Sequence, residues 1–391
     1  MGKRAFVIII DGVGIGELPD AEKYGDEGSD TLGNMAKLTG GLDLPNLQKL
    51  GLGCIHHIQG LTCIEHPTGS FGKMGELSPG KDSTTGHWEL GGLVLDHPFP
   101  TYPKGFPEEV ISEFVNRTGL EILGNYPASG TEIIKELGEE HLNTGKPIIY
   151  TSADSVFQIA AHEEVIPLER LYEICMISRQ ILTGEHSVAR VIARPFTGND
   201  KGSFVRTKYR KDFSLKPFGK TILRTLSEAG IPTIAIGKIN DLYAKDGIQI
   251  SEHTKSNEEG MEALTVSLQK YQSGFIMANL VDFDMLWGHR NDFIGFKKGL
   301  EKFDQWLEKF LLQLGSDDIL IITSDHGNDP TTPSTDHSRE YVPIILFGQR
   351  VKKGVNIGTR RSFADCQATL ADYFSVEKTA WGVSFFQLIF E

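Results

Sequence analysis

The stretch ILIITSDHGN, residues 319–328, contains the pattern that decides the fold: a short apolar run that ends in a carboxylate. The same pattern recurs at Asp11, at Asp154 and at the close pair Asp282 and Asp284. Short runs rich in β-branched residues are typical of parallel strands, and the carboxyl ends of such strands form the edge where open α/β sheets bind ligands. The sequence therefore predicts acidic side chains delivered to the edge of such a sheet.

Three histidines follow the last two acidic positions: His289 and His326 within five residues, and His337 twelve residues after Asp325. Carboxylate oxygens and imidazole nitrogens at one edge are ligands for hard or borderline divalent cations, and we expect two ions there. Histidines outside such motifs are more often core or surface residues without a role. We interpret seven in this way: His56, His57, His66, His97, His141, His186 and His253.

The composition indicates a soluble enzyme of two domains. A chain of 391 residues exceeds what one hydrophobic core usually organises. The net charge of −13 and the pI near 5.4 argue against nucleic acid or an anionic membrane as the main partner, because both bind basic surfaces. No stretch reaches the roughly 20 apolar residues of a membrane span.

The four cysteines are widely spaced and form no CxxC pair; they are Cys54, Cys63, Cys175 and Cys366. This spacing favours reduced cysteines in a protein core. We therefore expect a cytoplasmic protein.

The C-terminal half alternates helical periodicity with apolar strand runs. In chain order the alternating segments are 218–228, 231–236, 260–271, 275–281, 295–314, 319–324 and 341–347. Such alternation predicts an α/β fold with a doubly wound, mainly parallel sheet and helices on both faces. The run 5–10 should supply the first strand of the same sheet.

The middle of the chain follows a different pattern. It opens in a Pro-rich stretch, 98–103, and closes in a basic, irregular segment that ends at Pro217. We interpret residues 99–216 as a smaller α+β cap domain inserted into the sheet domain, which would then comprise 1–98 and 217–391.

The segment GKDSTTGHWE, residues 80–89, places three hydroxyls in a row between glycines. A hydroxyl beside a divalent cation can ionise and attack phosphorus, although hydroxyl clusters are more often turns or helix caps. From the residues alone, Ser83, Thr84 and Thr85 all remain candidates for the nucleophile.

Two further motifs carry candidate metal ligands. Asp284 and His289 are five residues apart and can converge on one ion if the chain turns back after its strand; Asp282 is an alternative ligand, although strand alternation would point it the other way. Asp325 and His326 can both face one ion only where the strand has ended, and Gly327 supplies that break.

These motifs together resemble the phosphopentomutase family of the alkaline phosphatase superfamily. The resemblance rests on Asp11 and on the segments 80–89, DFDMLWGH at 282–289 and SDHGND with TDH at 324–337. It extends to YTSADSV at 150–156, HEE at 162–164, RVIARP at 190–195 and IGKI at 236–239. TGHWE and YTSADS are the segments most particular to this family. The resemblance implies a core of alkaline phosphatase type.

The resemblance also implies roles for individual residues. Asp11, Asp325 and His326 would hold one Mn²⁺, and Asp284, His289 and His337 the second. Ser83 would be the phosphorylated nucleophile, where the family typically has threonine. The remaining implied residues belong to the sugar and phosphate pocket: Ser152, Asp154, Arg190, Ile192 and Lys238.

The implied reaction interconverts ribose 1-phosphate and ribose 5-phosphate, and the 2-deoxyribose pair, through a pentose 1,5-bisphosphate. A pentose or hexose bisphosphate would serve as phosphorylating activator. The alternatives are a phosphomonoesterase or a cofactor-independent phosphoglycerate mutase on the same metal site, and a metal-stabilised binding protein without catalysis. TGHWE and YTSADS weigh against the first two, and the complete ligand set weighs against the third.

Positive charge for the second phosphate could come from the basic stretch 201–216, which could equally be a solvated loop. The alternative for Arg190 and Arg194 is an ordinary ion pair at a domain interface.

Overall fold

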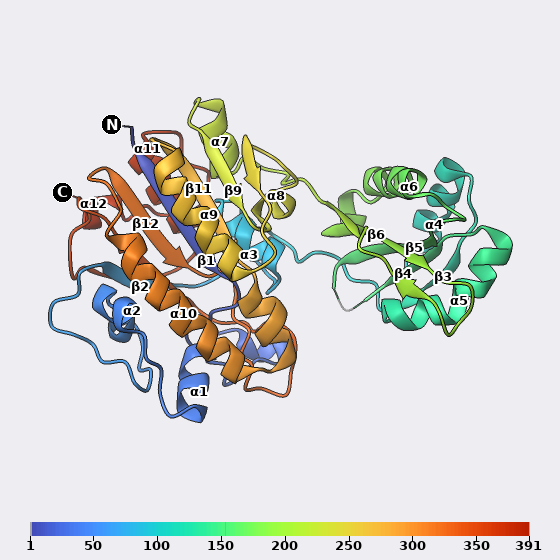
Figure 1. The fold of residues 1–391 in the computed structure, drawn as a ribbon. Coiled ribbons are helices and arrows are strands. Elements are labelled where there is room, and N and C mark those ends of the chain that lie inside the picture. Colours follow the sequence, from blue (N-terminus) through green and yellow to red (C-terminus); the bar gives the residue numbers. More distant parts are fainter. Residues whose placement is uncertain (1, 153, 391) are drawn as a thin grey trace. The chain divides into compact units, whose positions relative to one another are not determined.

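The computed structural model describes residues 2–152 and 154–390, and its chain forms two compact units (Figure 1). Met1–His97 and Pro217–Glu391 form the first, here called the core unit, and Pro98–Lys216 form the second, called the inserted unit. The sequence predicted breaks after residues 98 and 216. Each unit has its own sheet and its own hydrophobic core.

The core unit contains an eight-stranded sheet with the order β10-β9-β11-β1-β12-β13-β2-β14. The five strands from β10 to β12 are parallel, whereas β13 runs antiparallel to both of its neighbours. This confirms the predicted α/β sheet, which is mainly parallel. The strands are β1 (Arg4–Ile10), β2 (Ser70–Met74), β9 (Thr233–Ile236), β10 (Ile250–Glu252), β11 (Gly274–Leu280), β12 (Asp318–Thr323), β13 (Val342–Phe347) and β14 (Asn356–Arg360).

The register of the three central strands brings their carboxyl ends to one level. Every residue of β1 is buried, and Ile9 pairs with Asn279 of β11 on one side and with Thr323 of β12 on the other. A fully buried run of β-branched residues is what a central parallel strand requires. The loops that follow these strands therefore begin side by side.

Helices cover both faces of this sheet. On one face α9 and α10 lie across the strands in Figure 1, and Phe6 of β1 meets Phe310 of α10. On the other face Phe275 of β11 meets Phe374 of α11. The helices of the unit are α1 (Thr31–Leu38), α2 (Pro45–Leu50), α3 (Ser83–Leu90), α7 (Ile222–Glu228), α8 (Ile239–Leu242), α9 (Asn257–Lys270), α10 (Phe293–Leu311), α11 (Ala364–Phe374) and α12 (Phe386–Ile389).

Capping side chains explain where the structure departs from the predicted helix boundaries. The helix expected from residue 218 begins at Ile222, because the Thr221 side chain accepts a hydrogen bond from Arg224 N and caps it. The helix expected from residue 260 begins three residues earlier, after Ser256, whose hydroxyl accepts from Glu259 N. Periodicity locates the apolar face of a helix but not the residue that caps its first turn.

The inserted unit has a six-stranded mixed sheet with the order β3-β4-β5-β6-β7, and β8 pairs with β6. Helices α4 and α6 pack against one face through Phe114 and Leu171, and α5 packs against the other through Ile133. The elements are β3 (Leu123–Pro127), β4 (Ile148–Thr151), β5 (Val156–His162), β6 (Arg190–Thr197), β7 (Val205–Arg206), β8 (Lys211–Ser214), α4 (Glu108–Thr118), α5 (Gly130–Thr144) and α6 (Leu168–Ile181).

The prediction for two of the cysteines was wrong. Cys54 and Cys63 form a disulfide, and neither is buried, because they close a surface loop after α2. Cys175 and Cys366 are free and buried, as predicted. Pairing across nine residues without a CxxC pattern cannot be read from spacing alone. Among the described helices, none is both long and apolar enough to cross a membrane.

Candidate metal centre and nucleophile

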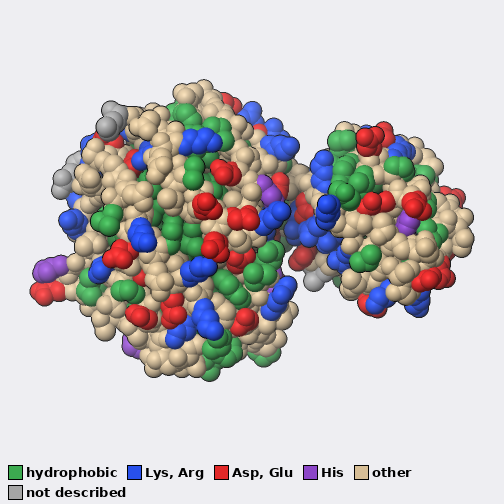
Figure 2. All heavy atoms as spheres, in the orientation of Figure 1, with side chains coloured by type: hydrophobic (Ala, Val, Ile, Leu, Met, Phe, Trp, Pro, Cys, Tyr) green, Lys and Arg blue, Asp and Glu red, His purple; other side chains and the backbone are tan. Residues whose placement is uncertain are grey.

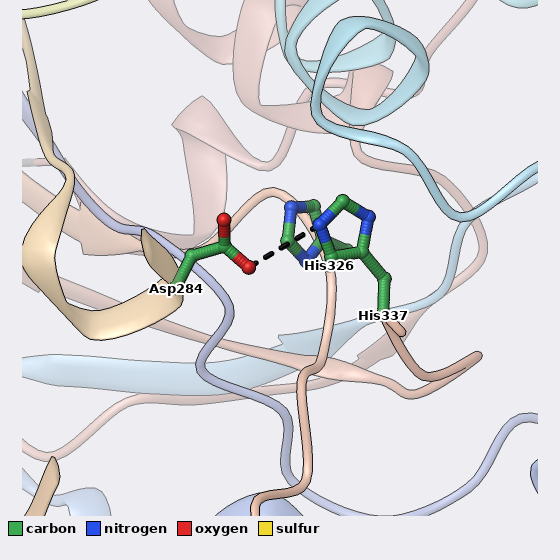
Figure 3. A group of neighbouring side chains, drawn as sticks. All are labelled: Asp284, His326 and His337. Atoms are coloured by element: carbon green, nitrogen blue, oxygen red, sulfur yellow. Dashed lines mark ion pairs between the residues drawn. The ribbon is translucent and has the colours of Figure 1, made fainter. Parts of the chain in front are cut away.

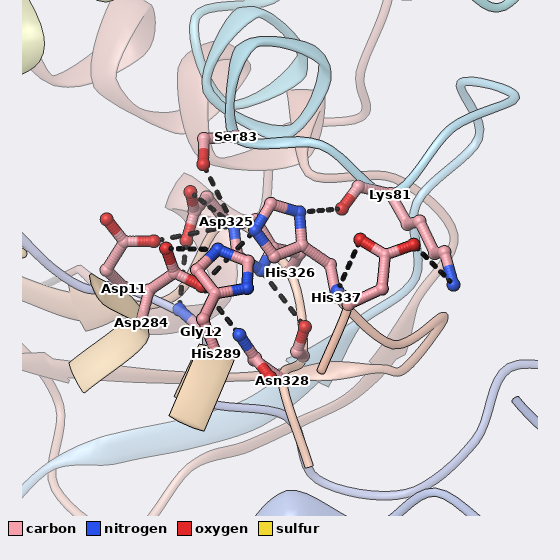
Figure 4. Close-up of polar contacts among 12 residues, drawn as sticks. Asp11, Gly12, Lys81, Ser83, Asp284, His289, Asp325, His326, Asn328 and His337 are labelled. Carbon is pink, nitrogen blue, oxygen red and sulfur yellow. Dashed lines mark hydrogen bonds and ion pairs between the residues drawn. The ribbon is translucent and has the colours of Figure 1, made fainter. Parts of the chain in front are cut away.

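The loops after β1, β11 and β12 bring all six predicted metal ligands together (Figure 4). Two sets of three side chains each offer ligand atoms within 4.8 Å of one another. One set is Asp11, Asp325 and His326. The other is Asp284, His326 and His337, in which the rings of His326 and His337 stack 3.8 Å apart (Figure 3).

Asp11, Asp325 and His326 are called the inner group here, because each is at most 1 % exposed. His326 Nε2 lies 3.4 Å from Asp11 Oδ1 and 3.2 Å from Asp325 Oδ2. Both of these buried carboxylate oxygens lack a hydrogen-bond partner among the described residues. Buried polar atoms without partners are costly, so convergent orphan oxygens fit a cation that would take their place as partner.

Asp284, His289 and His337 are called the outer group. His289 Nε2 lies 3.2 Å from Asp284 Oδ2, and His337 Nε2 lies 3.2 Å from Asp284 Oδ1. His337 Nε2 is also buried without a hydrogen-bond partner among the residues that the structure describes. One carboxylate thus lies between two imidazoles, which fits a second divalent cation.

A local irregularity of the helix explains how Asp284 and His289 meet. Phe283–Trp287 form a π-helical turn, directly followed by a 3₁₀ turn at Gly288–Arg290. Hydrogen bonds in a π turn join residues five apart, so residues i and i+5 come onto one face. That is the spacing of this pair. Such turns are frequent at functional sites.

Electrostatics within the inner group favour a bound cation. Burial raises the pKa of Asp11, and the carboxylates of Asp325 and Asp284 raise it further. Burial also opposes ionisation of Asp325, but the imidazoles of His326 and His87 outweigh it and hold its pKa below the ordinary value. Carboxylates this close repel one another, and a divalent cation would relieve that repulsion.

The outer group behaves as one ion pair network. Burial opposes ionisation of Asp284, yet His337 and His289 lower its pKa well below the ordinary value. The interaction with Asp284 in turn raises the pKa of His289 to about 9. A metal ligand must be a neutral imidazole, so a cation would compete with a proton for this histidine.

The hydroxyl of Ser83 is directed at the inner group, with its Oγ 3.1 Å from His326 Nε2. Ser83 is the first residue of α3, whose cap is Asp82. The Thr85 hydroxyl donates to that Asp82 carboxylate, so it is committed to the cap. Of the three hydroxyls that the sequence left open, Ser83 is the one that this geometry favours.

The rest of the TGHWE segment fixes α3 in place. At Gly86 a Cβ would lie 1.9 Å from the Asp325 carbonyl oxygen, so only glycine allows the helix to approach this closely. Glu89 accepts hydrogen bonds from the backbone of Leu77 and Ser78, and from the Ser362 hydroxyl. The segment therefore sets the distance between Ser83 and the candidate metal ligands.

Sequence reasoning missed two asparagines that hold the ligands from behind. Asn279 Nδ2 donates to Asp11 Oδ2 at 3.0 Å, and Asn328 Nδ2 donates to Asp284 Oδ1 at 2.7 Å. Both are at most 1 % exposed. The available signal was Asn279 itself, a polar residue within the apolar run 275–281.

Glu340 was also missed. Its buried carboxylate accepts from Thr31 N, the Thr31 hydroxyl and the Ser338 hydroxyl, and burial raises its pKa to about 8. A Cβ at Gly14 would lie 2.0 Å from this carboxylate, which accounts for one glycine of the GVGIG segment after Asp11.

The backbone before Ser83 is held by residues near His337. Arg339 is 3 % exposed and donates to the carbonyls of Ser78 and Gly80, and His337 Nδ1 donates to the Lys81 carbonyl at 2.8 Å. The loop before Ser83 and one candidate ligand of the outer group, His337, are therefore tied together.

Asp282, the alternative to Asp284 as a ligand, has a structural role. Its carboxylate accepts from Asn257 N at 2.7 Å, and its own N donates to Asn257 Oδ1 at 2.9 Å. It thereby fixes the first turn of α9. Strand alternation does not apply to this pair, because β11 ends at Leu280.

Four of the predicted pocket residues lie in the inserted unit. Arg190 and Ile192 are two residues apart on β6, so their side chains lie on the same face of its sheet, although Ile192 is buried. The guanidinium of Arg190 is 3.8 Å from Asp154 Oδ2 and 3.7 Å from Asp212 Oδ2. Ser152 Oγ accepts from Asp154 N at 3.4 Å. Ala153, between them, is outside the described residues.

Both ion pairs of Arg190 are therefore made within the inserted unit, as is the hydrogen bond from Arg194 Nε to Gln158 Oε1. In Figure 2 Lys and Arg side chains gather along one flank of this unit. Within the basic stretch, Arg210 binds Asp212 at 2.7 Å and Lys211 lies over the Tyr172 ring.

The last pocket residue, Lys238, lies in the core unit, at the start of α8. Burial and Asp325 raise the pKa of Asp11, and the charge of Lys238 opposes that rise. The structure thus brings the charge of Lys238 to bear on the inner group.

Comparison with known proteins identifies the family. Residues 3–378 match the metalloenzyme superfamily. The chain is 58 % identical over 384 residues to the phosphopentomutase of Carboxydothermus hydrogenoformans, covering 97 % of this chain and 99 % of the relative. It is also 58 % identical over 389 residues to that of Dictyoglomus thermophilum, covering 100 % and 99 %. The chain belongs to the phosphopentomutase family.

Family membership makes the chain an isomerase of the mutase type and a metalloenzyme. Among solved structures, the phosphoglycerate mutase of Leishmania mexicana is similar with a TM-score of 0.50 and 12 % identity, covering 98 % of this chain and 97 % of that one. That likeness concerns the fold alone.

Proposed function

We propose that this chain interconverts ribose 1-phosphate and ribose 5-phosphate, and the 2-deoxyribose pair, through a phosphorylated Ser83 and a pentose 1,5-bisphosphate. The observation that carries the proposal is the Ser83 hydroxyl, 3.1 Å from His326 Nε2, whose neighbours Asp11 Oδ1 and Asp325 Oδ2 are buried without a hydrogen-bond partner among the described residues. Its support from outside the site is the 58 % identity to phosphopentomutases over nearly the whole chain.

The inner group would hold one divalent cation and the outer group a second, with the Ser83 hydroxyl directed at them. Mixed carboxylate and imidazole sets suit hard or borderline divalent cations, and Mn²⁺ is our proposed ion because the family resemblance implies it. Bound cations would supply Lewis acidity at the Ser83 oxygen and at the phosphoryl oxygens.

Phosphoryl transfer then proceeds in two steps. The bond between phosphorus and Ser83 Oγ breaks as the free sugar hydroxyl of the pentose monophosphate attacks phosphorus, which gives the 1,5-bisphosphate. The phosphoryl group at the other end of the sugar next passes to Ser83 Oγ, and the isomeric monophosphate leaves. A pentose or hexose bisphosphate would phosphorylate the enzyme initially. The first turn of α3 suits this charge, because a helix N-terminus favours anions.

Five residues outside the metal groups would bind the sugar phosphate. They are Ser152, Asp154, Arg190, Ile192 and Lys238. Arg190 is the best supported, because it is partly exposed and its acidic neighbours lie beyond hydrogen-bond length, at 3.7 Å and 3.8 Å. A phosphate could therefore approach its guanidinium with bidentate geometry.

Phosphorus NMR distinguishes this function from the nearest alternative. Ribose 1-phosphate is incubated with the full chain, Mn²⁺ and a trace of pentose bisphosphate. We expect ribose 5-phosphate without a rise in inorganic phosphate, and a phosphate on the peptide 81–89 in the mass spectrum. Release of inorganic phosphate as the main product would instead establish a phosphomonoesterase.

A further inference from the structure

We propose that His87 is a positioning residue, which holds the Asp325 carboxylate and the first turn of α3 in fixed positions relative to Asp11 and His326. The inference rests on the metal site of the proposed function, but not on its substrate. The motif TGHWE contains His87, yet neither its spacing nor the ligand set assigns this histidine a task.

The imidazole of His87 is fully buried against two parts of the site. Its Nδ1 lies 2.8 Å from the carbonyl oxygen of Ser83 and 3.0 Å from Asp325 Oδ2. A carbonyl oxygen only accepts, so Nδ1 carries the hydrogen and donates it to Ser83. The same edge of the ring lies against the Asp325 carboxylate and limits where it can turn.

The other ring nitrogen, Nε2, is linked to the Asp11 carboxylate through the side-chain amide of Asn279. Asn279 Nδ2 lies 3.5 Å from Nε2, and with the hydrogen on Nδ1 this Nε2 can accept from the amide. The same Asn279 Nδ2 donates to Asp11 Oδ2 at 3.0 Å. One amide group has two hydrogens, so it can serve both acceptors.

A continuous series of buried contacts therefore runs from Asp11 through Asn279 and His87 to Asp325. It joins the two carboxylates of the inner group, which come from different strand ends, and it also contacts the backbone of the nucleophile. Partners behind metal ligands fix ligand orientation, and their loss typically lowers metal affinity by about 10- to 100-fold.

The residues on either side of His87 in α3 are held in place. Gly86 brings α3 within van der Waals contact of the Asp325 backbone, and Trp88 Nε1 donates to the Leu242 carbonyl on the far side. Since Nδ1 is committed to the Ser83 carbonyl, His87 acts through Asp325 and is not itself a ligand.

The test is a Mn²⁺ titration by calorimetry of the full chain after chelation, without any sugar phosphate. We expect His87→Phe to weaken one of two ions by 10- to 100-fold and to leave the other unchanged. His87→Asn places an amide nitrogen near the position of Nδ1 and should restore most of the affinity. His87→Gln places its amide nearer to Nε2 and should restore less.

The chain offers a matched control in His141, which is also fully buried. Its Nδ1 donates to the Lys146 carbonyl at 2.7 Å and its Nε2 accepts from His162 N at 2.8 Å, within the inserted unit. His141→Phe should lower the melting temperature and leave both Mn²⁺ affinities unchanged.

Two outcomes would overturn the inference. Equal Mn²⁺ binding by wild type and His87→Phe would reduce His87 to a packing role, and equal binding by His87→Asn and His87→Phe would refute the Nδ1 assignment. Should His87→Phe fail to fold, Asn279→Ala tests the same series of buried contacts and should weaken the binding of the same single ion. A chain that passes these tests but does not isomerise pentose phosphates would refute the proposed function alone.

Discussion

The inner and outer groups use the same ligand chemistry in different surroundings. The side chains of Asp11, Asp325 and His326 are at most 1 % exposed, whereas His289 is 39 % exposed and His337 is 13 % exposed. The inner group is supported by Asn279 and His87 at the end of a parallel sheet, and the outer group by Asn328, which donates to Asp284. The outer group depends on a π turn and on the loop at His337.

This difference teaches that burial can be distributed unequally within one candidate metal site. A ligand set fixed at strand ends is preorganised and needs little reordering when an ion binds. A set that includes a partly exposed histidine on a short turn can open locally at lower cost. We therefore expect the inner ion to exchange slowly and the outer ion to exchange first.

The largest effect should come from the hydroxyl directed at the inner group. Ser83→Ala removes the proposed acceptor of the phosphoryl group, so mutase activity and phosphate incorporation should disappear together. Ser83→Thr restores the common family residue and should keep substantial activity. The assay is isomerisation together with mass spectrometry of the peptide 81–89.

Thr84→Ala is the matched control, because it removes the adjacent hydroxyl, and it should retain phosphorylation. The opposite pattern, with Ser83→Ala active and Thr84→Ala or Thr85→Ala inactive, would move the nucleophile and separate it from the inner group.

The next effect tests the two groups as separate ion sites. Asp11→Ala should remove or severely weaken one ion, and Asp284→Ala, His289→Ala and His337→Ala should each weaken the other, because an incomplete ligand set leaves a cation underligated. Metal analysis after dialysis measures the stoichiometry. The exposed ligand, His289, should show the mildest loss of its set. Two full equivalents with intact activity in all four variants would disprove the assignment.

A smaller effect is expected from residues that would bind substrate but no ion. Arg190→Ala or Lys238→Ala removes a charge-assisted hydrogen bond worth roughly 1.5 to 3 kcal/mol, so kcat/KM for pentose phosphates should fall at least tenfold. Metal content should stay at the wild-type value. Unchanged kinetics in both variants would leave Arg190 with only its ion pairs to Asp154 and Asp212.

Asp282 and Asp284 sharpen the comparison further, because they are two residues apart and should respond differently. Asp282→Ala removes the partner of Asn257 N at the start of α9, and loss of such a cap costs about 1 kcal/mol of unfolding free energy. Chemical denaturation measures this change. Two bound ions should remain, and loss of an ion would make Asp282 a ligand after all.

The same pair shows how far the sequence could lead. Apolar runs that end in Asp predicted a mainly parallel sheet and its acidic edge, because alternation and strand ends are local properties, whereas the strand order came only from the structure. The sequence could not decide between Asp282 and Asp284, because that choice depends on a π turn and on Asn257, 25 residues away.

Residues that act through long-range contacts were hidden for the same reason. Glu340 binds Thr31 across 309 positions and Asn279 binds Asp11 across 268. The Cys54–Cys63 disulfide was mispredicted because its two residues meet only through the path of a loop. Helices α7 and α9 begin at other residues than predicted, because capping side chains set their first turns and hydrophobic periodicity does not reveal such caps.

The smallest effect concerns pH and the partly exposed histidine of the outer group. In the metal-free chain Asp284 raises the pKa of His289 to about 9, above the ordinary 6.5, so the folded chain binds this proton more tightly than the unfolded chain. The resulting stabilisation is complete below about pH 6.5 and is lost as the pH rises through about 9. Because the side chain is 39 % exposed, solvent screening should keep it within about 1 kcal/mol. The melting temperature of the chelated chain, measured at pH 6.5, 8 and 9, should therefore fall more steeply with pH for wild type than for His289→Gln. If the melting temperatures of the two proteins fall equally with pH, His289 is not paired with Asp284. The outer group would then lack the ion pair between these two residues.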